Sequence, residues 1–226
     1  MHTLAAADPA SRASRIGRPA AALIVTAAVL AVVFLSTAAV PYLTTDPERF
    51  GRLWPRRGWV WVHIAGGTVA LLVGPAQLWL GLTRRRVAMH RVLGRVYLGG
   101  VAIGSLAAFY LAFTTDLGWM FASGISGLAV AWVVTTYFAW LAIRRRLVVH
   151  HREWTIRSYV VTLGFVTFRA LFELLRAFDV GTLTERLGVA AWFCWALPLL
   201  VTEAALQGGK ILRHRVAAAP VRPAGD

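Results

Sequence analysis

Six long apolar segments separated by short polar ones make up most of the chain. They cover roughly residues 19–43, 59–82, 94–113, 120–143, 155–176 and 187–207. Each is close to the ~20 residues that a helix needs to cross the hydrocarbon core of a bilayer. The pattern therefore predicts an all-α fold, a polytopic membrane bundle of six transmembrane helices in which helices two to five form the core.

The same pattern divides the chain into four regions. Residues 1–18 are predicted to be a disordered cytoplasmic tail, 19–43 the first transmembrane helix, 59–207 a membrane domain of five helices, and 208–226 a second cytoplasmic tail. A cleavable signal peptide is the alternative for the first span, because small residues follow at Ser36–Ala39. Its apolar run exceeds the usual signal core of ~7–15 residues, which favours a retained helix.

Basic residues gather in alternate loops. The blocks are Arg12, Arg15 and Arg18; Arg84, Arg85, Arg86, Arg91 and Arg95; Arg144, Arg145, Arg146, Arg152 and Arg157; and Lys210, Arg213, Arg215 and Arg222. The positive-inside rule then predicts a protein of the bacterial inner (plasma) membrane with both termini cytoplasmic. The loop at 44–58 conflicts with this count, because it carries four arginines on the predicted outer side.

Composition supports a membrane protein. The 226 residues are 58% hydrophobic and 15% charged, with a mean hydropathy of +0.62. A net charge of +14 is by itself compatible with nucleic-acid binding. The arginine blocks lie between apolar spans, so we assign the charge to topology and expect the lipid bilayer, not nucleic acid, as the partner. Cys194 is the single cysteine and fits no disulfide or metal motif.

The segment from His150 to Arg176 carries a polar stripe at helical spacing. Its members are His151, Thr155, Ser158, Thr162, Arg169, Glu173 and Arg176. On one straight helix they fall within a narrow arc, so we predict that the fifth helix is buried with this stripe facing inward. Arg169 and Glu173 are four residues apart and are expected to form an ion pair inside the bundle.

Two segments resemble each other. His90–Tyr97 and His151–Tyr159 each read His-Arg, then an arginine, then a tyrosine two residues later, with spacings that differ by one. An internal sequence repeat is one explanation of this similarity. His90 and His151 each head a helix at the cytoplasmic side, where they are either interfacial anchors or ligands of a metal or haem. Glu203 is placed to pair with one of the nearby arginines.

The second helix has a face of small and polar residues. Its members are His63, Gly67, Ala70, Gly74, Gln77 and Gly81. Small residues let another helix approach closely, and they also leave room for a flat cofactor. We favour tight helix packing as the role of this face.

These motifs together resemble a bacterial family of predicted membrane proteins known as domain of unknown function 2306. The similarity covers about residues 59–206 and rests on His63 with Gly66-Gly67, Leu72–Gln77, His90–Tyr97, and His151–Tyr159 with Thr162 and Arg169. The segment Trp192–Glu203 also fits, with Pro198 in place of an expected Asn. The resemblance implies a membrane domain and assigns no activity. A looser analogy is to b561-type membrane cytochromes, which hold haem b between histidines of neighbouring helices.

These observations lead to two hypotheses for the function, and the sequence leaves open whether the protein is an enzyme. The first is membrane electron transfer with one haem b, ligated by His90 and His151 as metal ligands, with a quinone as electron partner. Four arginines are the candidate partners of the haem propionates: Arg91, Arg95, Arg152 and Arg157. The alternative is a non-enzymatic binding or transport protein for an anionic lipid or a small anion. The chain lacks the common hydrolase motifs.

A second polar group is predicted near the outer side. His63 lies close to the outer start of the second helix, and Arg169 and Glu173 are expected at a similar depth on the fifth. If these helices are neighbours, the three residues form one buried outer polar cluster in which His63 hydrogen-bonds the carboxylate. The cluster then either fixes the helix pair or serves as a proton relay or ligand site.

Overall fold

The computed structural model describes residues 17–84 and 86–217, and every regular element in these ranges is a helix. The predicted tail at 1–18 lies almost wholly outside the described residues, as do Arg85 and residues 218–226 of the second predicted tail. The side chains of Arg213 and Arg215 also lie outside the description.

Within these ranges five helical segments are long and apolar enough to cross a membrane alone. They are α1 (Arg18–Phe34), which continues through a π-helical turn (Leu35–Ala39) and a 3₁₀ turn (Val40–Tyr42), α3 (Arg57–Thr83), α4 (Val87–Phe113), α5 (Trp119–Arg144) and α8 (Leu183–Ala217). The short α2 (Pro47–Phe50) and a 3₁₀ segment (Gly51–Arg56) connect α1 to α3. The predicted all-α membrane bundle is confirmed.

The fifth predicted span is broken into two helices. α6 (Val148–Thr162) and α7 (Gly164–Ala177) meet at Leu163 with a bend of 44°. Together the two helices are long and apolar enough to cross a membrane, so the described residues hold six spans when the pair counts as one. Gly164 packs so closely on α5 that a Cβ there would lie 2.7 Å from Leu128 Cδ1. The prediction of one straight helix is therefore wrong, and the polar stripe changes direction at Leu163.

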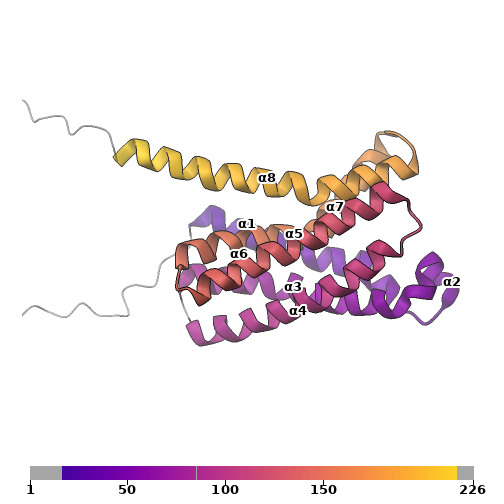
Figure 1. Cartoon of the computed structure of the whole chain (residues 1–226), viewed down its shortest axis with the longest axis horizontal. Coiled ribbons are helices and arrows are strands. Elements are labelled where there is room, and N and C mark those ends of the chain that lie inside the picture. Colours follow the sequence, from indigo (N-terminus) through magenta and orange to yellow (C-terminus); the bar gives the residue numbers. More distant parts are fainter. Residues whose placement is uncertain (1–16, 85, 218–226) are drawn as a thin grey trace, which may run out of the picture.

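The core consists of α3, α4, α5 and α6, which run along the length of the bundle (Figure 1). α3 packs along α4, α4 along α5, α5 along α6, and α6 returns to α3, so α4 and α6 lie diagonally opposite. α1 packs on α3, and α8 packs on α5, α6 and α7. Helices two to five therefore form the core, as predicted.

Glycines allow the closest of these contacts. A Cβ on Gly66 of α3 would lie 2.6 Å from the backbone of Gly100 and of Gly104 on α4. Gly74, farther along α3, leaves room for the ring of Tyr159, which would lie 2.1 Å from a Cβ. Of the predicted face, Gly74 therefore packs tightly, whereas a Cβ on Gly67 would meet nothing within 4 Å; Gly66, which makes the closest helix contact, was not part of that face.

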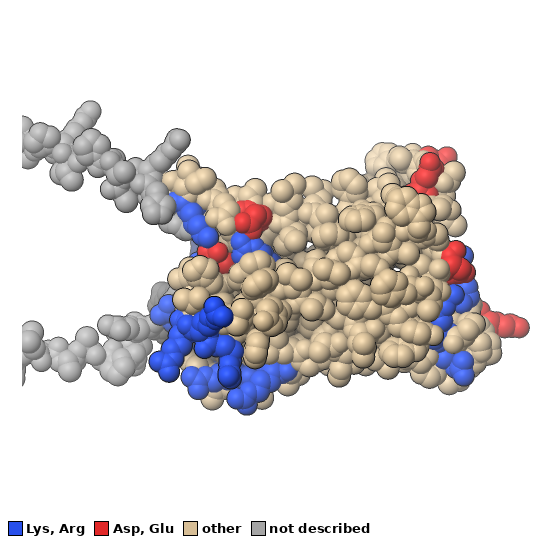
Figure 2. Space-filling view, in the orientation of Figure 1, with Lys and Arg blue, Asp and Glu red and all other residues tan. Residues whose placement is uncertain are grey.

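Charged residues gather at both ends of the bundle (Figure 2). The basic end carries Arg84, Arg86, Arg91, Arg95, Arg144, Arg145 and Arg146. At the opposite end, which we call the far end, arginines have acidic neighbours. Arg52 and Arg56 lie 3.9 and 3.6 Å from Asp116, and Arg49 lies 3.4 Å from Asp46. These pairs partly neutralise the arginines that conflict with the positive-inside count.

Candidate cofactor and ligand cavities

His90 and His151 occupy the same position in two helices. Each follows an arginine-rich turn with a left-handed residue, Arg86 (φ 52°) before α4 and Arg146 (φ 60°) before α6. Each donates its backbone N–H to the residue that caps its helix, His90 to Arg86 at 3.1 Å and His151 to Leu147 at 2.9 Å. The two turns therefore present the two histidines in the same way at the basic end.

A cavity of about 450 Å³ lies between α3, α4, α5 and α6 at this end. We call it the histidine-pair cavity. Its wall combines both histidines, three arginines and hydroxyl groups: His90, His151, Arg91, Arg95, Arg144, Tyr97, Thr136 and Ser158. Because α4 and α6 lie diagonally opposite, the two histidines reach this space from opposite sides.

The imidazoles of His90 and His151 meet in this cavity. Their ring centres are 6.2 Å apart and their planes are 81° from parallel. His151 Nδ1 lies 2.8 Å from the Ala139 carbonyl oxygen, which can only accept, so Nδ1 carries the proton and Nε2 keeps a free lone pair. Gln77 fixes the start of α4 by donating its amide to the His90 carbonyl at 2.7 Å. His90 Nδ1 is buried and makes no hydrogen bond of standard geometry.

The four predicted arginines divide between two places. Arg91 and Arg95 line the histidine-pair cavity, together with Arg144, which the sequence did not single out. Arg152 is exposed and is not part of the cavity wall. Arg157 is buried elsewhere, against α8. The structure therefore corrects the prediction at Arg152 and Arg157, neither of which is placed to bind a group in this cavity.

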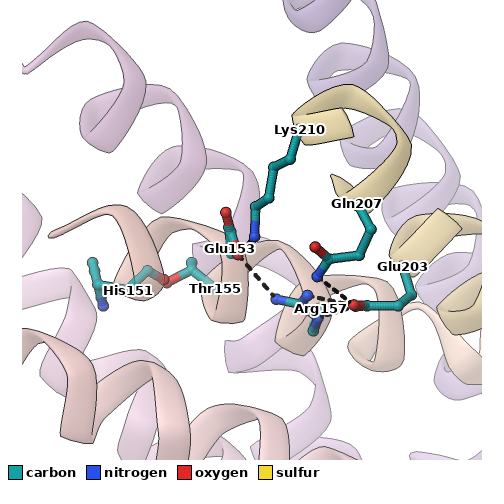
Figure 3. A network of polar contacts seen from close by, with 7 residues as sticks. All are labelled: His151, Glu153, Thr155, Arg157, Glu203, Gln207 and Lys210. Carbon is teal, nitrogen blue, oxygen red and sulfur yellow. Dashed lines mark hydrogen bonds and ion pairs between the residues drawn. The ribbon is translucent and has the colours of Figure 1, made fainter. Parts of the chain in front are cut away.

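Arg157 belongs to an ion network between α6 and α8 (Figure 3). Its Nε donates to Glu203 at 2.7 Å, and its guanidinium lies 3.9 Å from Glu153. Lys210 lies 2.9 Å from Glu153, and Gln207 donates to Glu203 at 2.6 Å. The Arg157 and Glu153 side chains are only 8% and 10% exposed. The charges alternate, so the network joins α6 to the second half of α8. The predicted pairing of Glu203 with an arginine is confirmed.

A hydroxyl cluster occupies the centre of the bundle. Thr136 contacts Ser158 at 2.7 Å, Ser158 contacts Tyr97 at 2.8 Å, and Tyr97 contacts Thr162 at 2.7 Å. Trp132 donates to Thr162 at 2.8 Å, and Thr162 donates to the Ser158 carbonyl. Thr162 thus accepts from Tyr97, and each hydroxyl proton has an acceptor. All five side chains are buried, so the cluster fixes α4, α5 and α6 to one another.

A second cavity, of about 430 Å³, lies in the far half of the molecule. We call it the apolar cavity. Its wall is rich in aromatic rings: Phe34, Phe50, Phe121, Trp132, Phe165 and Phe168. Trp132 and Thr162 of the hydroxyl cluster line this cavity, while Tyr97, Thr136 and Ser158 line the histidine-pair cavity. The cluster therefore separates the two cavities.

The predicted outer polar cluster is not formed. Arg169 and Glu173 do pair, at 3.4 Å, but their side chains are 60% and 36% exposed, and Glu173 also holds Arg176 at 2.7 Å. His63 instead lies with Nδ1 2.9 Å from the Gly104 carbonyl oxygen and its ring against Phe165. No hydrogen bond or ion pair joins these described groups to His63. Arg169 still reaches the wall of the apolar cavity. The bend at Leu163 leaves the Arg169–Glu173 pair partly exposed and not buried against His63.

Tyr97, Trp132 and Thr136 were not predicted from the sequence to meet between the two cavities. Tyr97 follows His90 by about two helical turns, and Thr136 follows Trp132 by about one, so each pair shares a helix face. This spacing is the feature of the sequence that could have indicated that these residues lie together. Which faces meet across the bundle depends on the diagonal placement of α4 and α6, which no local pattern contains.

Fold and cavities together define an all-helical, polytopic membrane protein with two cavities. The chain belongs to the family of predicted membrane proteins designated DUF2306, whose model matches residues 60–206, from α3 through most of α8. This confirms the resemblance seen in the sequence. No curated protein and no solved structure matches the chain.

Proposed function

We propose that the histidine-pair cavity binds one haem b between His90 and His151, and that the protein carries electrons in the membrane. The observation that supports this most is the distance between the two rings. A metal–imidazole bond is ~2.0 Å long and the ring centre lies about 1 Å beyond it, so two imidazoles on opposite sides of one metal have centres about 6 Å apart. The ring centres of His90 and His151 are 6.2 Å apart, which matches that spacing.

The donor set favours haem over a bare metal ion. No group of three or more His, Cys, Asp and Glu side chains comes together in the described part of the chain. Two imidazoles alone leave a zinc site short of its usual four ligands. A porphyrin supplies four nitrogens of its own, so that two axial histidines complete the coordination of its iron.

The cavity wall suits the rest of a haem group. Its volume of about 450 Å³ lies within the ~300–1,000 Å³ typical of ligand pockets. Arg91, Arg95 and Arg144 lie on its wall, and guanidinium groups bind carboxylates well. The Nδ1 hydrogen bond of His151 to Ala139 orients that ring, as outer-shell partners of metal-bound histidines do.

A spectrum of the purified protein tests the proposal. Protein expressed with ample haem should show a Soret band, with one haem per chain after extraction. Replacing His90 or His151 with Ala should abolish the band. His150→Ala is the matched control, because His150 adjoins His151 but is exposed and absent from the cavity wall. A colourless wild-type protein, or a full band in both cavity variants, would contradict the proposal.

A second candidate uses the same cavity. Its three arginines also suit an anionic lipid headgroup or a small anion, without any redox chemistry. Co-purified phospholipid that is lost in an Arg91→Gln/Arg95→Gln double variant, in a protein that takes up no haem, would favour this non-enzymatic binding function.

We also propose that the basic end faces the cytoplasm of a bacterial inner membrane, with both termini on that side. The arginine turns at this end support the orientation, and the acid–arginine pairs at the far end remove part of the conflict. Reporter fusions after Arg86 and Arg146 should read cytoplasmic, and an external signal at either would reverse the assignment.

A further inference from the structure

His63 presents a hydrogen-bond acceptor to the apolar cavity. Its Nδ1 lies 2.9 Å from the Gly104 carbonyl oxygen, which can only accept, so Nδ1 carries the proton. The other nitrogen, Nε2, is then unprotonated. It makes no hydrogen bond to any described residue, although His63 is part of the cavity wall. An acceptor without a partner in an apolar setting is costly, so this position favours a ligand that donates a hydrogen bond.

The surrounding wall defines the rest of such a ligand. The ring of Phe165 stands edge-on to His63, with centres 5.6 Å apart, and Phe168 stands 5.8 Å beyond it. Phe121 and Trp132 add further aromatic surface. Aromatic walls favour a flat ring at van der Waals distance. The indole N–H of Trp132 is not available to a ligand, because it already donates to Thr162.

We propose that the apolar cavity binds the ring of a lipophilic hydroquinone, with one of its hydroxyl groups donating to His63 Nε2. The volume of about 430 Å³ accommodates a substituted ring and the first part of an alkyl tail. Both the ring and the tail match the apolar wall. The choice of a hydroquinone over another hydroxyl compound rests on the proposed haem function, since a hydroquinone is a membrane-soluble electron donor.

The test compares two ligands on the purified protein. Calorimetric titration under anaerobic conditions would measure binding of a decyl-substituted benzohydroquinone and of its dimethyl ether, which lacks both donors. The hydroquinone should bind wild-type protein about tenfold more tightly than the ether, because the ether leaves His63 Nε2 unpaired. Equal binding of the two would overturn the inference and indicate non-specific partitioning.

Variants make the assignment specific to His63. His63→Phe keeps an aromatic ring against Phe165 but removes the acceptor, so it should lower hydroquinone affinity about tenfold and abolish the preference over the ether. His150→Ala should change neither. An unchanged preference in a His63→Phe protein that still binds haem would refute the site. The outcome is independent of the haem spectrum, so hydroquinone binding by a haem-free protein would uphold this inference and reject the proposed function alone.

Discussion

The two cavities differ in whether a second histidine side chain stands beside the first. Each has a histidine whose Nδ1 is fixed on a backbone carbonyl of a neighbouring helix, His151 on Ala139 and His63 on Gly104. In the histidine-pair cavity a second imidazole, that of His90, stands 6.2 Å away. In the apolar cavity no second imidazole is present among the described residues of the wall. In the functions proposed above, the pair would hold a metal, and the single histidine would accept a hydrogen bond.

The largest effect should come from breaking the pair. His151→Ala should remove the haem entirely and leave hydroquinone affinity within about twofold, because the hydroxyl cluster separates the two cavities. His63→Phe should give the reverse pattern. Absorption spectra and binding titrations on the two variants measure this directly. Parallel loss of both ligands in either variant would show that the cavities are not independent.

A large loss of stability is expected at Arg157. Arg157→Leu leaves Glu153 buried with only Lys210 as partner, and losing one member of a buried ion network costs about 3 kcal/mol. Arg152→Leu, on the exposed side of the same helix, should cost less than about 0.5 kcal/mol. Thermal unfolding in detergent compares the two variants, and equal melting temperatures would reject the structural role of the network.

A smaller loss is expected where the cavities are separated. Tyr97→Phe removes one hydroxyl from the cluster and leaves Ser158 and Thr162 each short of a partner, at a cost of about 1–2 kcal/mol. Thermal unfolding would measure this loss. Tyr110→Phe serves as a control, because Tyr110 is exposed in the same helix, and a similar loss there would remove the significance of the first result.

The smallest effect is expected at Arg169. The straight-helix prediction placed it in the bundle, where its removal should be severe. The structure leaves its side chain 60% exposed in a surface ion pair, so Arg169→Leu should change the free energy of unfolding by less than about 0.5 kcal/mol. Chemical denaturation would measure it, and a loss above about 2 kcal/mol would restore the buried position.

The sequence predicts the spans and much of the basic end well. The spans are predictable because length and hydropathy are local properties of the sequence. His90 and His151 both lie near the starts of helices that follow arginine-rich turns, and the number of spans between them places both at the same end of the bundle. The break at Leu163 was not predictable in this way. No proline marks it, and it depends on the contact of Gly164 with Leu128 and on the hydrogen bond of Thr167 to the Cys194 carbonyl, which are long-range contacts. The positions of Arg157 and His63 depend on tertiary neighbours for the same reason.

Electron paramagnetic resonance of the oxidised, haem-loaded protein tests the central claim most directly. His90 and His151 have ring planes 81° from parallel, so iron bound by both should give a low-spin ferric signal with the strong anisotropy that near-perpendicular imidazoles produce. Removing either histidine should abolish that signal. A high-spin ferric signal from the wild-type protein would show that the two histidines do not both bind the iron, and would contradict the account.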